Sequence, residues 1–326
     1  MKKRSASLLL LSMLIFGAAV PLKSLAAEYP SKPMTLVVGA APGGPTDIMA
    51  RLLAKEMGEL LRQTIVVDNK PGANSLIATD YVARSESDGY TLLLAYNAHV
   101  ANPLLMKSAK YDAQKDFSPV GLAVNLPMVL LASPNASFNT PHELVAAIKA
   151  KPDAVTYGSS GRGGAPHLAG ELMQSRLGSS MIHVPFKGNA PALTELMASR
   201  IDFMFYPMIG IKDFVEQKRV KLLGVTAAQR LPDFPGAPTL SESGLPGFEQ
   251  TSPWIGMLAP ANTPADRVAQ VSAALKTTLA KASVKERLRQ LGAVPSYRDA
   301  TEFATFLRGD IERWSKVISA AGLQPE

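Results

Sequence analysis

The chain has 326 residues, of which 47% are hydrophobic and 19% charged, and its formal net charge is +7. This composition is that of a globular protein, and the length suits two α/β lobes better than a single core. The chain contains no cysteine, which excludes a disulfide framework, a lipid-modified cysteine and thiolate metal sites.

The first 26 residues have the pattern of a secretory signal peptide. A basic start, MKKR, precedes the apolar run LLLLSMLIFGAAV at 8–20, and Ser24 and Ala26 are the small residues at positions −3 and −1 of a cleavage site. The apolar run is shorter than the ~20 residues of a membrane-spanning helix. We therefore expect cleavage after Ala26 or Ala27, and a soluble, monomeric protein in the bacterial periplasm.

Removal of this segment takes away four basic residues and no acidic one, so the formal charge falls from +7 to +3. No long basic tract with interleaved aromatic residues remains in the mature chain. We therefore expect no nucleic-acid partner.

The first part of the mature chain alternates strand and helix patterns. A buried strand is predicted at 34–38, and a helix with an apolar face follows from Thr46. The apolar residues of that helix recur at steps of four, four and three: Met49, Leu53, Met57 and Leu60. The next predicted segments are a strand at 64–67, a helix at 75–84 and a strand at 90–96. This order indicates a mostly parallel sheet.

A second α/β series begins where Thr140 and Glu143 have the spacing of a helix capping box. Strands and helices then alternate up to a Pro-rich loop at 229–248. A strand follows at 251–260, and capping residues at 263–266 and 299–302 predict two final helices.

These elements predict two α/β lobes joined by crossing segments. We expect a first lobe of residues 27–127 plus 253–326 and a second lobe of residues 128–252. Ligands of open α/β sheets bind beyond the carboxyl ends of the strands, so the ligand is expected in the cleft between the lobes.

Patterns for catalysis are mostly missing. GAAPGGPTD lacks the lysine of a phosphate-binding loop, and GSSGRGG lacks the serine spacing of a nucleophile elbow. The four histidines, His99, His142, His167 and His183, form no pair with metal-ligand spacing. We therefore expect no metal, no cofactor and no enzyme activity; a periplasmic hydrolase using Ser160 and His167 is the enzyme alternative.

Two glycine-rich loops, each between a strand and a helix, are the candidate binding elements. The first offers Gly43, Gly44 and the hydroxyl of Thr46 at a helix start, with Asp47 in the first helical turn. Backbone N–H groups and the positive end of the helix dipole favour an anion there.

The second loop offers the hydroxyls of Ser159 and Ser160 and the open backbone of Gly161 and Gly163. Two such loops facing each other across a cleft would bind a small molecule with a carboxylate at one or both ends. Arg162 either takes a second carboxylate or points into solvent.

The chain resembles the substrate-binding proteins of tripartite tricarboxylate transporters, also called the Bug family of extracytoplasmic solute receptors. The resemblance rests on YPSKPMTLVVGAAPGGPTDIMAR (29–51), NKPGA (69–73), YGSSGRGGAPHLAGEL (157–172), RLPDFPGAPTLSESGLPGFE (230–249) and WIGMLAPANTP (254–264). These blocks run in order along the mature chain.

The resemblance implies a periplasmic-binding-protein (venus-flytrap) fold and a small carboxylate ligand. That ligand would be passed to a membrane permease with a large and a small subunit. By position, the first-lobe contacts would fall on Pro42 to Asp47. The second-lobe contacts would fall on Ser159 to Gly163, with His167 opening the helix behind. Asp202 matches a segment of the family, in which it either touches the ligand or fixes a strand end.

Three positions depart from the family pattern. Gly39 and Ala40 replace a bulkier pair, which would leave more room below the cleft, and Tyr206 stands where an acid is common. Together with Arg162 these changes favour a larger or more apolar acid, such as an aromatic or longer-chain acid. A role in presenting ligand to a membrane receptor, instead of transport, stays open.

Overall fold

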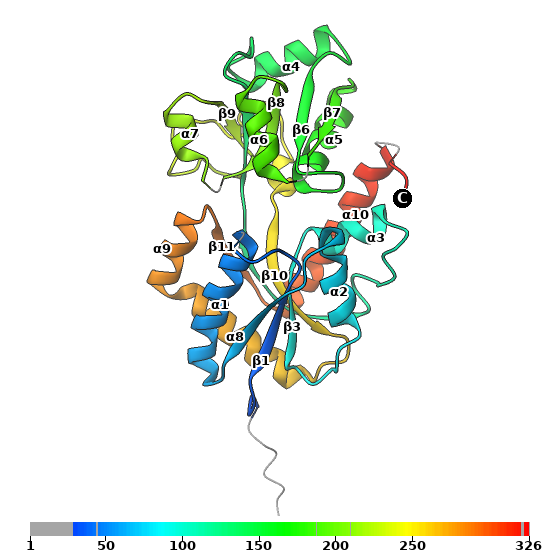
Figure 1. Cartoon of the computed structure of the whole chain (residues 1–326), viewed down its shortest axis with the longest axis vertical. Coiled ribbons are helices and arrows are strands. Elements are labelled where there is room, and N and C mark those ends of the chain that lie inside the picture. The colour runs from blue at the N-terminus through cyan, green and yellow to red at the C-terminus, as the bar shows by residue number, and fades with distance from the viewer. Residues whose placement is uncertain (1–28, 44, 187, 209, 321–322, 326) are drawn as a thin grey trace, which may run out of the picture.

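The computed structural model describes residues 29–43, 45–186, 188–208, 210–320 and 323–325. The predicted signal peptide and Gly44 lie outside the described residues. The described chain forms two β-sheets, one in the lower and one in the upper part of the molecule in Figure 1.

The six-stranded sheet has the strand order β11-β4-β10-β3-β1-β2. Its strands are β1 (Met34–Val38), β2 (Ile65–Asn69), β3 (Thr91–Tyr96), β4 (Phe117–Asn125), β10 (Trp254–Pro260) and β11 (Val294–Arg298). Strand β1 pairs in parallel with β2 and β3, whereas β10 runs antiparallel to β3 and β4 and β11 runs antiparallel to β4. The predicted parallel order is confirmed for the first three strands, and the sheet as a whole is mixed.

The five-stranded sheet has the strand order β7-β6-β8-β5-β9. Its strands are β5 (Met128–Ala132), β6 (Thr156–Ser159), β7 (Ile182–Pro185), β8 (Phe203–Pro207) and β9 (Lys221–Val225). Strand β6 pairs in parallel with β7 and β8, and β5 runs antiparallel to β8 and β9. Both sheets therefore combine a parallel part with antiparallel strands.

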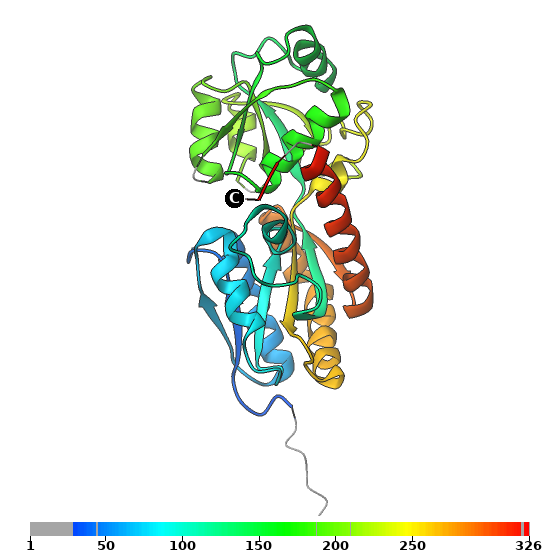
Figure 2. The same ribbon diagram turned by 90° about the vertical axis from the view of Figure 1, so that its right-hand side faces the viewer.

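Helices cover both faces of each sheet (Figures 1 and 2). The α-helices are α1 (Pro45–Leu61), α2 (Leu76–Ala83), α3 (Ala98–Leu105), α4 (Pro141–Ala150), α5 (Ala165–Leu177), α6 (Asn189–Met197), α7 (Lys212–Glu216), α8 (Ala265–Ala280), α9 (Ala282–Gln290) and α10 (Ala300–Ala320). Two short 3₁₀ helices, η1 (Ala73–Ser75) and η2 (Phe248–Thr251), complete the set.

Side-chain alternation along β1 explains the layering. Met34, Leu36 and Val38 pack in one core with α1, α8 and α9, whereas Val37 packs in a second core with α2, α3 and α10. Successive residues of a strand point to opposite faces, and the strands of a sheet covered on both faces are nearly continuous apolar runs. The apolar run of β1 is therefore explained by helices that pack on both faces of the sheet.

In helix α1 the apolar spacing predicts the buried residues correctly except in the last turn. Met49, Leu53 and Met57 are buried as predicted, but Leu60 is 40% exposed and Leu61 is buried in its place. The last turn of the helix meets the core one residue later than the spacing predicts.

Helices begin at all three places where a capping pattern predicts them, and two of the three predicted caps are confirmed. Thr140 Oγ1 accepts the Glu143 N–H at 3.2 Å, and Asp299 and Glu302 accept each other's N–H groups. The predicted cap at 263–266 is wrong, because Thr263 Oγ1 donates to Pro260 O and Pro264 occupies the N-cap position.

The chain crosses between the sheets twice, between β4 and β5 and between η2 and β10. Leu126 N–H of the first crossing donates to Pro253 O of the second at 2.7 Å. Helix α10 runs alongside both parts in Figure 2, and Leu168 of α5 shares a core with its residues Trp314 and Ile318.

Trp254 anchors the second crossing to α10. Its indole N–H donates to Asp310 Oδ2 at 2.8 Å, and Asp310, which is 1% exposed, also pairs with Arg313. A buried carboxylate that loses a donor is costly, so this contact fixes where β10 leaves the second crossing.

We predict that Trp254→Phe lowers the free energy of unfolding by about 1–3 kcal/mol more than Trp314→Phe does. Both variants shrink a buried ring, but only the first removes a donor from Asp310. Urea unfolding of the two variants and the parent measures the difference. Equal losses would show that the Asp310 bond contributes nothing beyond packing.

Candidate functional site

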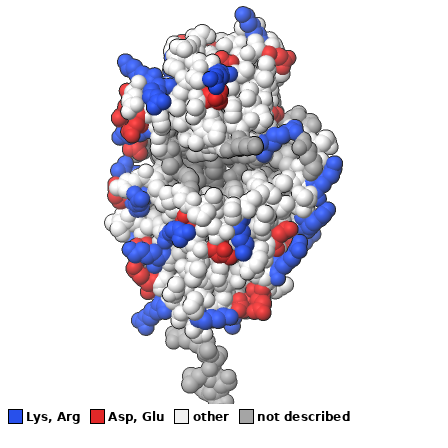
Figure 3. All heavy atoms as spheres, viewed as in Figure 1, with Lys and Arg blue, Asp and Glu red and all other residues white. Residues whose placement is uncertain are grey.

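A cavity of about 510 Å³ lies between the two sheets. The part with the six-stranded sheet contributes Thr46, Asn74, Tyr96 and Asn97 to its lining, and the part with the five-stranded sheet contributes Ser160, Pro166, Asn189 and Tyr206. Leu126, Pro253 and Ile255 line it where the chain crosses. We call this cavity the cleft; Figure 3 shows a face of the molecule that is hollowed between the two parts, with acidic and basic side chains interspersed over both.

The cleft lies where parallel strands end and helices begin. Tyr96 ends β3 and Asn97 is the N-cap of α3, and Thr46 lies in the first turn of α1. On the opposite side, Ala165 opens α5 and Asn189 opens α6. The N-terminus of a helix carries partial positive charge and unpaired N–H groups. Four helices thus direct their positive ends at this cavity from both parts of the molecule.

The first glycine-rich loop is held by the carboxylate of Asp47, which is 2% exposed. Asp47 accepts hydrogen bonds from Arg51 Nε, Asn69 Nδ2 and the Gly43 N–H, each at 2.9 Å. The Arg51 hydrogen bond above all, then those from Gly43 and Asn69, lower the pKa of Asp47 to about 2 against the effect of burial. Asp47 is therefore an ionised anchor of the loop.

The predicted residues of this loop are placed differently from one another. Thr46 lines the cleft, whereas Pro42 and Gly43 are exposed and Asp47 is turned into the protein. Gly43 has a φ of 79°, which favours glycine.

In the second loop, too, one of the predicted residues lines the cleft and its neighbour is buried in the protein. Ser160 lines the cleft, but Ser159 is fully buried and its Oγ lies 2.6 Å from His183 Nε2. The Gly161 N–H donates to Ser159 Oγ at 3.1 Å, with Gly161 at a φ of 120°. The structure therefore brings Ser160 to the cleft and uses Ser159 to shape the loop.

Arg162, Gly163 and His167 line a separate cavity of about 270 Å³ beside the cleft. Asn74 lines both cavities, and Leu323 and Gln324 near the C-terminus also line the smaller one. His167 Nδ1 accepts the Gly163 N–H at 3.1 Å and its Nε2 lies 3.4 Å from Glu171 Oε1. Both ring nitrogens of His167 therefore face other protein groups, whereas a general base for Ser160 would direct one nitrogen at the serine hydroxyl.

Asp202 and Tyr206 lie towards opposite ends of the same strand. Tyr206 lines the cleft, and burial raises the pKa of its hydroxyl. Asp202 precedes β8, and its Oδ2 accepts the N–H and the hydroxyl of Thr156 at 2.8 and 2.7 Å. Of the two roles considered for Asp202, this is the one that fixes a strand end.

Several cleft residues were missed by sequence reasoning: Asn74, Tyr96, Asn97, Leu126, Asn189 and Ile255. Asn97 and Asn189 could have been found, because each stands between a predicted strand and the next helix, where α/β ligands bind. Asn189 Oδ1 is buried without a hydrogen-bond partner among the described residues, so this acceptor is unsatisfied at the wall of the cleft.

The extra room expected from Gly39 is occupied by another side chain. A Cβ on Gly39 would overlap the side chain of Ser75. The small residue therefore allows η1 to pack against the end of β1, and that expectation was wrong at Gly39.

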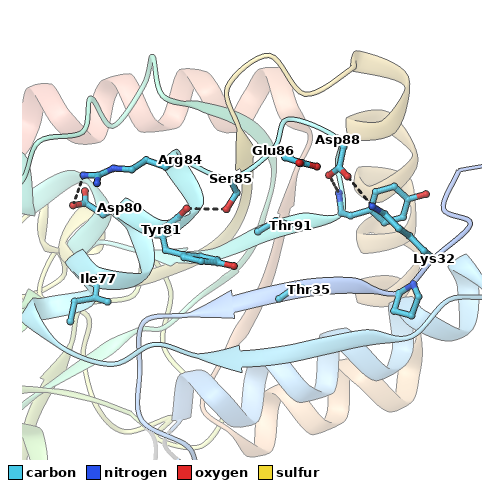
Figure 4. Close-up of a pocket in the computed structure, with 12 residues that line it drawn as sticks. Lys32, Thr35, Ile77, Asp80, Tyr81, Arg84, Ser85, Glu86, Asp88 and Thr91 are labelled. Atoms are coloured by element: carbon cyan, nitrogen blue, oxygen red, sulfur yellow. Dashed lines mark hydrogen bonds and ion pairs between the residues drawn. The ribbon is translucent and has the colours of Figure 1, made fainter.

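A larger open hollow of about 900 Å³ lies on the outside of the six-stranded sheet (Figure 4). Four of its charged side chains form pairs, Lys32 with Asp88 at 3.2 Å and Arg84 with Asp80 at 3.3 Å. None of the predicted site residues lines it. The cleft is therefore the candidate site.

Comparison with known proteins agrees with this geometry. The family of tripartite tricarboxylate transporter receptors matches residues 49–323, and the chain belongs to it. The chain is 34% identical to the periplasmic binding protein BugD, with a TM-score of 0.77 over 91% of this chain and 100% of BugD.

Two further solved structures carry a carboxylate. An R. palustris protein with adipate is 32% identical, with a TM-score of 0.80 over 91% of this chain and 100% of that one. MatC from Rhodopseudomonas palustris with bound malate is 32% identical, with a TM-score of 0.76 over 89% of this chain and 100% of MatC.

The predicted periplasmic-binding-protein fold is confirmed, and family and fold are those of solute-binding receptors. Among the residues that the structure describes, no helix is long and apolar enough to cross a membrane.

From the lowered pKa values of two histidines we predict a loss of stability in mild acid. Burial lowers the pKa of His99 to about 4 despite its hydrogen bond to Ala113 O, and burial together with the nearby His167 lowers the pKa of His183 to about 4. Unfolded histidine titrates near ~6.5, so the unfolded chain binds more protons between about pH 6.5 and pH 4. The free energy of unfolding therefore falls as the pH falls through that window.

We expect His99 alone to account for a decrease on the order of 2–3 kcal/mol across this window. His99→Gln, which keeps a donor for Ala113 O, should reduce the pH dependence, and His142→Gln at an exposed site is the matched control. Urea unfolding at pH 7, 5.5 and 4.5 measures the slopes. A parent whose stability does not change between pH 6.5 and 4.5 would contradict the prediction.

Proposed function

We propose that the protein binds a small carboxylate in the cleft and passes it to a tripartite tricarboxylate-type permease with a large and a small membrane subunit. The convergence of the N-termini of α1, α3, α5 and α6 on one cavity carries this proposal. Helix N-termini bind anions through backbone N–H groups and the helix dipole. Membership of the transporter receptor family supports the permease as recipient.

The size and the lining of the cleft fit such a ligand. A cavity of about 510 Å³ falls within the ~300–1,000 Å³ of small-molecule sites. Hydrogen bonds to a charged group contribute roughly 1.5–3 kcal/mol each, so three or four give about micromolar affinity after the cost of association. The adipate and malate bound by similar proteins support a diacid of this size.

We propose direct roles for the predicted residues that line the cleft. Thr46 and Ser160 would donate hydroxyl hydrogen bonds to carboxylate oxygens from opposite sides, and Tyr206 would pack against the ligand body. Apolar neighbours such as Leu126 and Ile255 favour an acid with an aliphatic or aromatic body.

We propose cleavage of residues 1–26, release of a monomer into the periplasm, and lobes of residues 27–127 plus 253–326 and 128–252. The strands of the six-stranded sheet and those of the five-stranded sheet fall in these ranges, and the family match supports the compartment.

If the helix N-termini bind the negative charge of the carboxylate, removal of that charge should weaken binding, and this can be tested directly. A thermal-shift screen of mono-, di- and tricarboxylates and aromatic acids should find an acid that raises the melting temperature, and calorimetry should measure its Kd. The methyl ester or amide of that acid should bind at least ~10-fold more weakly, because it lacks the charge that the helix N-termini favour. A neutral analogue that binds as tightly would contradict a carboxylate site.

Ser160→Ala and Thr46→Val should each weaken binding of the best acid by about 10-fold, since each removes one donor to a charged group. Ser241→Ala, at an exposed position away from the cleft, is the control and should bind as the parent does. If both cleft variants keep the Kd of the parent, the two hydroxyls do not contact the ligand.

A further inference from the structure

Each of the two glycine-rich loops is closed by a hydrogen bond of the same kind, from a glycine N–H to a side chain four residues later. The Gly43 N–H donates to Asp47 Oδ2 in the first loop, and the Gly163 N–H donates to His167 Nδ1 in the second. Each acceptor stands four residues after its glycine, and the φ angles of the two glycines are 79° and 76°. In both loops a side chain from the first turn of the next helix therefore fixes the backbone that precedes it.

The identity of the acceptor differs between the loops. Asp47 is an ionised carboxylate that can only accept, whereas a neutral histidine has one acceptor and one donor nitrogen. Because Nδ1 of His167 accepts from Gly163, its proton lies on Nε2, which is 3.4 Å from Glu171 Oε1. The second loop thus depends on one tautomer of a side chain that is 1% exposed.

The surroundings of Glu171 favour that tautomer. Tyr157 donates its hydroxyl to Glu171 Oε1 at 2.5 Å, and Gln174 Nε2 donates to Oε2 at 2.9 Å. A Cβ on Gly170 would overlap the Tyr157 ring, so the glycine lets Tyr157 lie against α5 and reach the carboxylate. A carboxylate held in this way is an acceptor for the Nε2 proton of His167.

The hydrogen bond between Gly163 and His167 lies where the two parts of the molecule contact each other. A Cβ on Gly163 would lie 2.8 Å from Leu105 Cδ1 of α3, so the loop packs closely against the part with the six-stranded sheet. Ser160, three residues earlier in the same loop, lines the cleft. The position of the loop therefore sets both what Ser160 presents and how closely the two parts approach.

We propose that His167 is a positioning residue: its Nε2-protonated tautomer holds Gly163, and with it loop 159–163, in the shape that binds the carboxylate, without contact to the ligand. His167 lines the smaller cavity and not the cleft. The inference rests on the proposed function, and it gives control of the loop to His167, which the family resemblance places behind the contact residues.

Two isosteric variants separate the roles of the ring nitrogens. In His167→Asn the side-chain oxygen falls near the place of Nδ1 and can accept from Gly163. In His167→Gln the amide nitrogen falls near the place of Nε2 and can donate to Glu171, but the acceptor for Gly163 is lost. Calorimetry with the best acid of the screen should give a Kd within about 3-fold of the parent for His167→Asn and at least 10-fold weaker for His167→Gln.

Melting temperatures without ligand control for folding. Parent-like binding by His167→Gln would overturn the inference. Equal weakening in both variants would also overturn it, because it would point to contact with the ligand or to general packing.

A measurement on the parent keeps the test independent of whether the variants fold. In ¹⁵N-histidine NMR at pH 7.5, His167 should show a protonated Nε2 and an unprotonated Nδ1. A proton on Nδ1 would overturn the inference whatever the ligand. If the parent binds none of the acids, the proposed function fails, and that result is distinct from a parent that binds while His167→Gln binds equally well.

Discussion

The hydrogen bond from Leu126 N–H to Pro253 O keeps the two crossings of the chain side by side. Because β4 leads through the first crossing into β5 and the second crossing leads into β10, this contact holds the ends of β4 and β10, neighbours inside the six-stranded sheet, next to the start of β5 in the five-stranded sheet. In the cleft beside these crossings, residues at the ends of strands and at the starts of helices from both parts of the molecule come together. The position of the cleft is thus a consequence of topology, with α10 supporting it from the side (Figure 2).

In the proposed function, backbone dipoles and not formal charges would give the cleft a preference for anions. The described residues that line it are uncharged, and the ionised Asp47 is turned away to hold Gly43 and Arg51. Partial charges at helix ends stabilise an anion by a modest amount each, and several together reach useful affinity. A receptor that must release its ligand benefits from this, because no single strong ion pair has to be broken.

Much of the architecture could be predicted from the sequence, because strand and helix periodicity and turn residues are local signals. The site was harder, since its composition depends on contacts between distant segments. Ser159 and Ser160 are adjacent and chemically alike, yet one is buried against His183 and the other lines the cleft. Likewise, Asp202 and Tyr206 flank one short strand, and only Tyr206 lies at the end that faces the cleft. Asn74 reaches the site through a positive-φ turn that no apolar pattern marks.

The central claim is that helix N-termini of both parts of the molecule bind a carboxylate in the cleft. A crystal structure with the best acid of the screen tests this most directly. We expect at least one carboxylate oxygen within hydrogen-bond distance of backbone N–H groups at the start of α1, α3, α5 or α6, with Ser160 or Thr46 alongside. A ligand bound in the outer hollow of Figure 4, or one whose carboxylates point into solvent, would contradict the account.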